Sequence, residues 1–332
     1  MVISVIIPTY NGEKRLVGCL DSIINQDYPR DNLELLVVND ASEDGTVAVA
    51  EKYGARVLTN GSRNIERGKS IGLQNATGEL VFLIDDDNRL PSPDWLSRCV
   101  AAMNAHPEAV GAEAIYFSYN RRDPVANRYC SLFGINDPLA YYLNKRDRLT
   151  HAEKRWSLGG KVLEETPDYY LVQFTKDNLL TVGSQGFLTR RELLLQTIYA
   201  PYLFHIDSNL DLVNAGHDTF LMMKLYVIHQ HSDTISHLLK KSCRNLRLFL
   251  EQSSLRRYRW KTNYLKFLLV VVSMMTFVRP LYDSCKGYRQ KPDSAWFLHP
   301  VLCFATVVMY GTMVITWYAR RLLHGKKEVV HA

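Results

Sequence analysis

The stretch GELVFLIDDDN, residues 78–88, decides how this chain folds. Its apolar part, residues 81–84, is short and follows a glycine, which is typical of a buried parallel strand. Asp85, Asp86 and Asp87 come directly after it. Three adjacent carboxylates at the end of an apolar sheet repel one another unless a cation or hydrogen-bond donors lie among them. Hard oxygen ligands suit Mg2+ or Mn2+, so we expect a cation beside a substrate's phosphates, with a solvated acidic turn as the alternative.

The residues before this strand repeat a strand-and-helix pattern. Residues 2–8 form a β-branched run that ends in the turn cluster PTYNG, and an amphipathic helical pattern follows over residues 16–24. Further strands are predicted over residues 33–38 and 55–58, each followed by a helical pattern. Repeated units of this kind predict an α/β fold with a mixed, mainly parallel sheet and helices on both faces.

Polar residues follow three of these strands. They are residues 9–11, Asp40 and residues 85–87. Parallel strands bind ligands beyond their carboxyl ends, so we expect these side chains to meet at one edge of the sheet.

The charge is distributed unevenly along the 332 residues. Residues 240–332 carry a net charge of +13, and residues 1–239 carry −7. A basic end beside apolar runs indicates anionic lipid head groups as neighbours. We prefer a lipid to a nucleic-acid partner for this basic region, because no nucleic-acid-binding motif accompanies the charge.

The cysteines and the N-terminal residues indicate that the main part of the protein faces the cytosol. The 6 cysteines show neither CxxC spacing nor a disulfide framework, so we expect free thiols. The first residues, MVISVIIPTYNG, lack a basic region and a cleavage site, and they predict a first strand and not a signal peptide.

Four segments in order, SVIIPTYN, VVNDASEDGT, GLQNATGELVFLIDDDN and PSPDWL, resemble the family 2 glycosyltransferases of the GT-A fold. The resemblance covers roughly residues 2–240. It implies an inverting transfer from a nucleotide-activated sugar, assisted by a divalent metal.

The resemblance assigns the donor site by position. Residues that would border the nucleotide are Pro8, Thr9, Tyr10, Asn11, Asp40 and Lys69. Asp85, Asp86 and Asp87 would hold the ribose and the metal, with Asp85 and Asp87 as metal ligands. The donor expected from the resemblance is a UDP-sugar. The family usually has two acids where this chain has Asn39-Asp40, and often Arg-Asn where it has Lys69-Ser70. Asp40 as a helix cap and Lys69 as a solvated helix residue are the alternatives.

The resemblance also assigns an acceptor loop. Residues 179–191, LLTVGSQGFLTRR, are similar to the family's strand and turn beneath the acceptor. Gly183, Ser184 and Gln185 would contact the acceptor, because glycine allows the backbone to approach a sugar closely.

An inverting transfer needs a carboxylate that takes the proton of the acceptor hydroxyl. The family pattern runs from an acidic pair through Asp-Leu and Ala-Gly to a histidine, and it places the base at Asp207 and the histidine at His229. Ile206 replaces the usual glutamate, so Asp218 remains the second candidate for the base. His229 would contact the metal or a phosphate, and a structural histidine is the alternative.

The C-terminal third predicts membrane contact. Residues 238–262 have the composition of a basic helix on an anionic membrane surface. Within them RRYRW resembles the Gln-x-x-Arg-Trp motif of membrane polysaccharide synthases, so Arg259 and Trp260 would line the mouth of the acceptor site. A juxtamembrane cluster with an interfacial tryptophan is equally consistent with this motif.

Two apolar segments follow. Residues 301–319 are free of charge and flanked by aromatic and basic residues, which predicts a membrane span. Residues 267–278 are short for a span, so a hairpin with both ends cytosolic competes with a re-entrant or interfacial helix, and we favour the hairpin slightly.

The sequence therefore predicts a glycosyltransferase domain over residues 1–237, a basic helix over 238–262 and a membrane hairpin over 263–332. The expected enzyme sits at the cytosolic face of the cell membrane and uses Mg2+ or Mn2+. It would transfer sugar from a nucleotide donor to a lipid-linked or growing glycan acceptor. The alternatives are a subunit of a processive polysaccharide synthase and an inactive membrane-bound scaffold.

Overall fold

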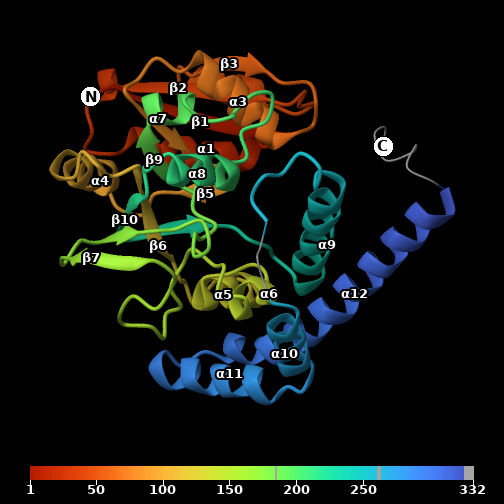
Figure 1. Ribbon diagram of the computed structural model, residues 1–332. Coiled ribbons are helices and arrows are strands. Elements are labelled where there is room, and N and C mark those ends of the chain that lie inside the picture. Colours follow the sequence, from red (N-terminus) through yellow and green to blue (C-terminus); the bar gives the residue numbers. More distant parts are fainter. Residues whose placement is uncertain (184, 260–262, 325–332) are drawn as a thin grey trace. The chain divides into compact units, whose positions relative to one another are not determined.

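The computed structural model describes residues 1–183, 185–259 and 263–324, and the chain divides into two compact units (Figure 1). The first unit comprises Met1–Ser118, Asp147–Leu149 and Arg155–Gln230. The second comprises Tyr119–Arg146, Thr150–Lys154 and His231–Ala332. Residues 119–146 belong to the same unit as the C-terminal helices, so this division differs from the predicted boundary at residue 237.

The first unit is built on a mixed sheet. Within the described residues the sheet has ten strands in the order β3-β2-β1-β4-β9-β6-β10-β8-β7, and β5 pairs with β10. Strands β3, β2, β1 and β4 are parallel to one another, and so are β6 and β10, whereas β9 runs against both of its neighbours. The strands are β1 (Ile3–Thr9), β2 (Leu33–Asn39), β3 (Arg56–Thr59), β4 (Leu80–Leu83), β5 (Asn88–Arg89), β6 (Gly111–Phe117), β7 (Lys161–Glu165), β8 (Tyr169–Gln173), β9 (Phe187–Arg190) and β10 (Thr219–His229).

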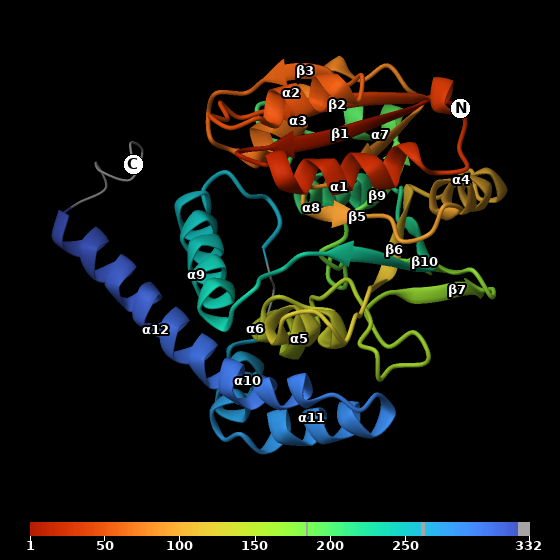
Figure 2. The same cartoon turned by 180° about the vertical axis from the view of Figure 1, so that it is seen from behind.

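Helices cover both faces of this sheet, as the repeated pattern predicted (Figures 1 and 2). Because side chains of a strand alternate between faces, Val5 belongs to a core cluster with Leu16, whereas Ile6 belongs to a second cluster with Leu73. The helical elements of this unit are α1 (Glu13–Ile24), η1 (Arg30–Asn32), α2 (Thr46–Lys52), α3 (Ile65–Asn75), α4 (Trp95–Ala105), α7 (Arg191–Leu195) and α8 (His205–Asn214).

The second unit is helical. Its core is an aromatic cluster in which the rings of Phe133 and Trp296 lie 4.6 Å apart, and Leu238 and Leu302 pack into the same cluster. The helical elements are α5 (Val125–Phe133), α6 (Pro138–Tyr142), α9 (Ile235–Glu251), α10 (Tyr264–Met275), α11 (Val278–Gln290), η2 (Ser294–Leu298) and α12 (His299–His324). The predicted basic helix is thus α9, which begins before residue 238 and ends at Glu251.

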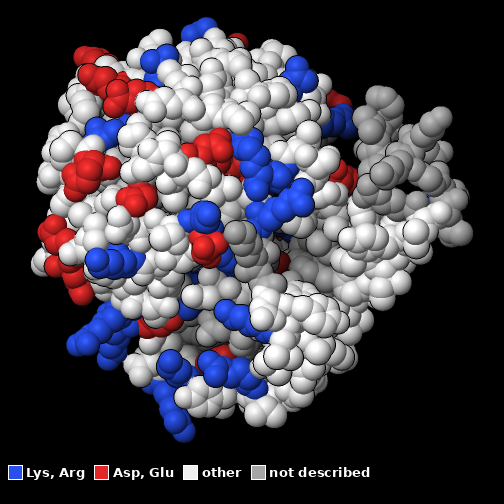
Figure 3. All heavy atoms as spheres, in the orientation of Figure 1, with Lys and Arg blue, Asp and Glu red and all other residues white. Residues whose placement is uncertain are grey.

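Within the described residues, one helical stretch, Ser294–Arg320, is long and apolar enough to cross a membrane. It contains the predicted span. The other predicted segment is broken: α10 ends at Met275, Phe277 adopts a left-handed φ of 61°, and α11 leaves at a bend of 69°. A bend of this size is the geometry of either a broken span or a re-entrant segment, so the hairpin stays a prediction. On the face drawn in Figure 3, the surface over α10 and α12 is largely free of charged side chains.

Candidate active site

The ends of β1, β2 and β4 bring the polar residues of the sequence motifs to one edge of the first unit. Thr9 lies opposite Asn39 in the parallel register, and the Asp40 N–H donates to the Thr9 carbonyl at 2.9 Å. The Thr9 hydroxyl in turn donates to Asp86 at 2.6 Å. Residues 77 positions apart in the chain are therefore joined directly.

Asp86 is paired with a residue that the sequence motifs did not indicate. The Arg15 guanidinium donates to both carboxylate oxygens of Asp86, at 3.1 and 3.0 Å, and also to the Tyr10 carbonyl at 3.2 Å. This bidentate ion pair satisfies Asp86 within the protein. No signal in the sequence could have found it, because Arg15 reads as an ordinary polar position of an amphipathic helix.

Asp85 has a different environment. Its Oδ1 is buried and has no hydrogen-bond partner among the described residues, while the Lys69 ammonium lies 3.8 Å away. Burial raises the pKa of Asp85 to about 6, although the charge of Lys69 opposes the rise. Lys69 is only 2% exposed, so the solvated helix position considered for it is wrong. The buried carboxylate oxygen has the chemistry of a cation ligand.

Asp87 lies beside the histidine that ends β10. The His229 Nε2 is 3.3 Å from Asp87 Oδ2, and Asn88 donates to Asp87 Oδ1 at 3.1 Å. Asp85, Asp87 and His229 thus lie at the same edge of the sheet, at the ends of β4 and β10.

The oxygen and nitrogen atoms of these groups are suitable ligands for a hard divalent cation, although they do not form a complete set of protein ligands. Within the described parts of the chain, no group of three or more His, Cys, Asp and Glu side chains is arranged to hold a metal ion. Mg2+ is commonly held by one or two carboxylates together with water and substrate phosphates. Asp85 and Asp87 can supply the two carboxylates of such an open site.

Asp40 and its neighbours line the edge between β1 and α3. Asp40 is buried, and its Oδ1 accepts from the Arg63 N–H at 2.6 Å. It does not cap a helix, since α2 begins after Gly45 without a side-chain cap. Tyr10 is 40% exposed, and the Arg63 guanidinium lies 5.3 Å from the centre of the Tyr10 ring.

The turn around Pro8 and Asn11 shapes the same edge. Asn11 has a left-handed φ of 46°, and its side-chain oxygen accepts from Glu43 at 2.9 Å. A Cβ on Gly68 would stand 3.2 Å from the Pro8 Cβ, so α3 lies close against the end of β1.

The predicted acceptor loop lies next to the acidic strand. The Gly186 N–H donates to the Leu83 carbonyl at the end of β4, at 3.1 Å. Gly183 has a φ of 125°, which favours glycine, and a Cβ there would stand 2.9 Å from the His205 Cβ. Ser184 lies outside the described residues, and Gln185 contributes its backbone carbonyl to the anchoring described next.

A buried ion pair that the sequence did not indicate anchors this loop. Glu113 of β6 and Arg148 are both fully buried, 2.8 Å apart. Glu113 accepts from the Gly183 N–H at 2.9 Å, and Arg148 donates to the Gln185 carbonyl at 3.1 Å. Burial raises the pKa of Glu113 to about 7, against the attraction of Arg148. The pair therefore holds the loop backbone on both sides of residue 184.

The two candidates for the base lie at different places. Asp207 is buried in the first turn of α8, and Asn209 of that helix donates to the Val182 carbonyl at 2.8 Å. Asp218 precedes β10, at the edge opposite to His229, and accepts from Gln173 at 2.9 Å. Since β10 runs in the same direction as β4, the sheet separates Asp218 from the acidic residues.

The RRYRW segment is described only in part. Arg259 is an exposed residue of the second unit, and Trp260 lies outside the described residues.

Comparisons with known proteins agree with this geometry. The sequence pattern of the family described as Glycosyl transferase family 2 matches residues 4–194, which is more than half of the chain. The chain is 33% identical over 112 residues to the poly(ribitol-phosphate) beta-N-acetylglucosaminyltransferase TarS of Staphylococcus aureus, covering 32% of this chain and 19% of that protein.

A second relative is the dolichyl N-acetyl-alpha-D-glucosaminyl phosphate 3-beta-D-2,3-diacetamido-2,3-dideoxy-beta-D-glucuronosyltransferase of Methanococcus voltae. It is 35% identical over 101 residues, covering 28% of this chain and 31% of that protein. The matched region therefore spans less than a third of either curated relative.

The fold is that of a solved glycosyltransferase. The mannosyltransferase PcManGT of Pyrobaculum calidifontis, solved with GDP-Man and Mn2+, superposes with a TM-score of 0.51 and 17% identity, over 96% of this chain and 80% of that one. The sheet with helices on both faces is thus the predicted GT-A fold. With the family pattern, the acidic strand end and this fold in agreement, the chain belongs to the family 2 glycosyltransferases.

Proposed function

We propose that this enzyme transfers a sugar, with inversion, from a UDP-sugar to a hydroxyl of a lipid-linked or growing glycan at the cytosolic face of a membrane. The observation that carries the proposal is the buried carboxylate oxygen of Asp85, which lies 3.8 Å from the Lys69 ammonium and has no hydrogen-bond partner among the described residues, at the edge where Asp87 and His229 also lie. A diphosphate with its divalent cation is a ligand that would complete this arrangement.

The residues at the ends of β1, β2 and β4 would bind the donor. Asp40 and Tyr10 would border the base, and Thr9 keeps Asp86 in place beside the ribose. Lys69 would lie near a phosphate as a point charge, since its ammonium is already held beside Asp85. Mg2+ or Mn2+ held by Asp85 and Asp87, with His229 nearby, would neutralise the charge that develops on the departing diphosphate.

Asp207 would take the proton from the acceptor hydroxyl. It lies in the first turn of α8, next to the loop at Gly183 that would carry the acceptor. Because Asp207 is fully buried, an acceptor reaches it only when the residues that cover it move. The proposal therefore includes an opening of this region before transfer.

The membrane part of the proposal rests on the second unit. Ser294–Arg320 could hold the enzyme at a bilayer, and α10 and α12 expose many apolar side chains. An anchored enzyme meets a lipid-carried acceptor at a raised local concentration. The Methanococcus voltae relative, whose name specifies a dolichyl phosphate sugar, supports an acceptor of this class.

The test is a screen for release of nucleotide from UDP-sugars and GDP-sugars by membranes that contain the enzyme, with and without Mn2+. GDP-sugars are included because the similar mannosyltransferase was solved with GDP-Man. We expect turnover of a UDP-sugar that needs the metal. Turnover of GDP-sugars alone would overturn the choice of donor, and equal turnover after removal of the metal would overturn the metal site.

A matched pair of variants tests the base. Asp207→Asn should lower transfer by about 100-fold or more, the usual contribution of a general base, while donor binding is unchanged. Asp218→Asn makes the same chemical change at the opposite edge and should leave transfer intact. Loss of transfer in Asp218→Asn alone would exchange the two assignments. The length of the product distinguishes a single transfer from polymer synthesis.

A further inference from the structure

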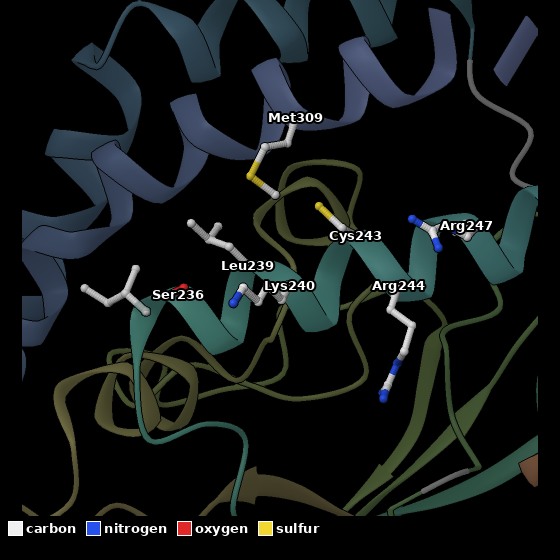
Figure 4. Close-up of a pocket in the computed structure, with 8 residues that line it drawn as sticks. Ser236, Leu239, Lys240, Cys243, Arg244, Arg247 and Met309 are labelled. Atoms are coloured by element: carbon white, nitrogen blue, oxygen red, sulfur yellow. The ribbon is translucent and has the colours of Figure 1, made fainter. Parts of the chain in front are cut away.

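A cavity lies between α9 and α12, within the second unit. It has a volume of about 580 Å3, in the range of sites for small ligands. Figure 4 shows Leu239 and Cys243 of α9 directed towards α12, and Met309 of α12 directed back towards them. The inner wall is thus apolar.

The outer wall of the same cavity is cationic. Lys240, Arg244 and Arg247 line it, and their spacing of three and four residues places them on one face of α9. All three side chains are exposed, and Arg244 extends away from α12 at the rim (Figure 4). Among the described residues that line the cavity, none is acidic. A ligand that matches both walls is an anion attached to an apolar chain.

The helix that carries Met309 also exposes apolar side chains outside the cavity. On α12, Val308 is 46% exposed and Ile315 is 70% exposed. These side chains belong to the stretch that is apolar enough to cross a membrane.

We propose that this cavity binds the phosphate head group of an anionic membrane phospholipid. Arginine and lysine are the side chains that proteins use for phosphate, and anionic lipids attract basic segments near the membrane. A membrane phospholipid is the occupant that we favour, because the cationic lining lies beside the helix that is apolar enough to cross a membrane. The bound lipid would tie α9 to α12 and to the bilayer.

Cys243 reports on occupancy of the cavity. It lines the cavity and is partly exposed, Cys285 is exposed elsewhere, and the remaining cysteines are buried. The full-length enzyme with Cys285→Ser is placed in nanodiscs of phosphatidylcholine, with or without phosphatidylglycerol, and reacted with a neutral maleimide. We expect phosphatidylglycerol to slow the labelling of Cys243 by about tenfold or more, since three cations attract the head group.

Two variants disrupt the site by different means. Lys240→Gln, Arg244→Gln and Arg247→Gln together should abolish the effect of phosphatidylglycerol on labelling. Met309→Trp should weaken it, because the larger ring narrows the cavity opposite Leu239 and Cys243 without changing the charge. The matched control carries Arg121→Gln, Arg122→Gln and Arg289→Gln, three exposed cations of the same unit outside the cavity, and should keep the effect.

Four outcomes would overturn the proposal. They are equal labelling in both lipids, loss of the effect in the control triple variant, an undiminished effect in the Lys240, Arg244 and Arg247 triple variant or in Met309→Trp, and equal protection by free glycerol phosphate in phosphatidylcholine nanodiscs. Protection by an isoprenyl phosphate but not by phosphatidylglycerol would assign the cavity to the acceptor instead. The readout does not use sugar transfer, so its failure leaves the proposed function untouched.

Discussion

Asp86 accepts hydrogen bonds on both carboxylate oxygens, from Arg15 and Thr9, whereas its two neighbours face other groups. Asp85 lies beside Lys69 and Asp87 beside His229. The repulsion between three adjacent acids is thus relieved by a separate positive or hydrogen-bonding partner for each. We therefore assign the proposed cation to Asp85 and Asp87, and we assign Asp86 to holding the turn beside the proposed ribose site.

This assignment predicts different effects for two neighbouring substitutions. Asp87→Asn should weaken Mn2+-dependent binding of UDP by about 100-fold, since loss of even an outer partner of a metal ligand costs about 10–100-fold. Its free energy of unfolding should change little. Calorimetric titration with UDP, with and without Mn2+, measures the binding affinity. Urea unfolding measures the free energy of unfolding.

Asp86→Asn is the matched control. It should lower the free energy of unfolding by about 1 kcal/mol, because it breaks the ion pair with the partly exposed Arg15. Unaltered metal-dependent UDP affinity in Asp87→Asn would remove Asp87 from the metal site.

Gly183 provides a second prediction at this scale. Gly183→Ala places a Cβ 2.9 Å from the His205 Cβ at a φ of 125°, so the loop must shift. We expect a loss of about 1–3 kcal/mol in stability and a loss of transfer activity. Gly216→Ala is the control, because its φ of 93° is also unfavourable but nothing lies within 4 Å of the added Cβ. Equal transfer rates in both variants would show that the loop position does not matter.

At the scale of elements, the pair Glu113–Arg148 connects β6 to the acceptor loop. Arg148 also donates to Asp147 at 2.7 Å, and its guanidinium lies 5.1 Å from the centre of the Phe117 ring. A fully buried ion pair contributes little net stability, but removing one partner leaves an uncompensated charge. The pair is therefore a positioning device for the loop more than a source of stability.

The corresponding prediction is a double-mutant cycle. Arg148→Met should lower the free energy of unfolding by about 3–5 kcal/mol, because Glu113 then remains buried without its partner. Adding Glu113→Gln to that variant should recover part of the loss, since the amide is uncharged and can still accept from Gly183. Urea unfolding of the four proteins measures the coupling, and simple additivity would contradict it.

In the second unit, Asp293 links the start of η2 to α5. It accepts from Arg128 at 2.6 Å, from the Ala295 N–H at 2.7 Å and from the Tyr119 hydroxyl. Desolvation opposes ionisation, but hydrogen bonds from Tyr119 and Ala295 and the charge of Arg128 lower the pKa of Asp293 below its ordinary value. The folded protein therefore releases this proton more readily than the unfolded chain.

The lowered pKa of Asp293 in the folded protein makes its contribution to stability depend on pH. The stabilisation by Asp293 is fully present above its unfolded pKa of about 3.9 and is lost as the pH falls through the lower folded pKa. Asp293→Asn should therefore destabilise the protein at pH values near neutrality, and the difference from wild type should shrink in strong acid. Urea unfolding of both proteins, near neutral pH and in strong acid, measures this difference in the free energy of unfolding. The same difference at both pH values would mean that the aspartate acts through shape and not through its charge.

At the scale of the whole molecule, exposed apolar side chains gather on α10 and α12. Examples are Leu269, which is 60% exposed, and Ile315, which is 70% exposed. Surfaces of this kind mark contact with a membrane or a partner, and the basic residues of α9 are suited to the charged head groups of a bilayer.

Membrane insertion of α12 can be tested with one substitution. Val308→Lys places a charge near the middle of the predicted span, residues 301–319, at an exposed position of α12, where it costs about 2.5–3.5 kcal/mol in a bilayer. We expect a large fraction of this variant to be released from membranes by alkaline carbonate. Leu163→Lys, at an exposed apolar position of β7, should remain bound like wild type. Equal retention of both variants would argue against insertion of α12.

The βα repeat, the acidic strand end and the family were determined by the sequence alone, because each depends on residues that are close in the chain. Periodicity places β1 and β2 to within one residue of their observed bounds, and it places the end of α1 correctly but its start three residues too late. The same local signals placed Asp85, Asp86 and Asp87 beyond the carboxyl end of a buried strand.

The pairing of those acids was decided only by the tertiary structure. Arg15 and Asp86 are 71 positions apart, and Glu113 and Gly183 are 70 apart, so no local pattern specifies which side chains meet. The packing of residues 119–146 with the C-terminal helices has the same origin. Periodicity reports which face of an element is apolar, whereas the partner of a charged group depends on how the packed elements bring distant residues together.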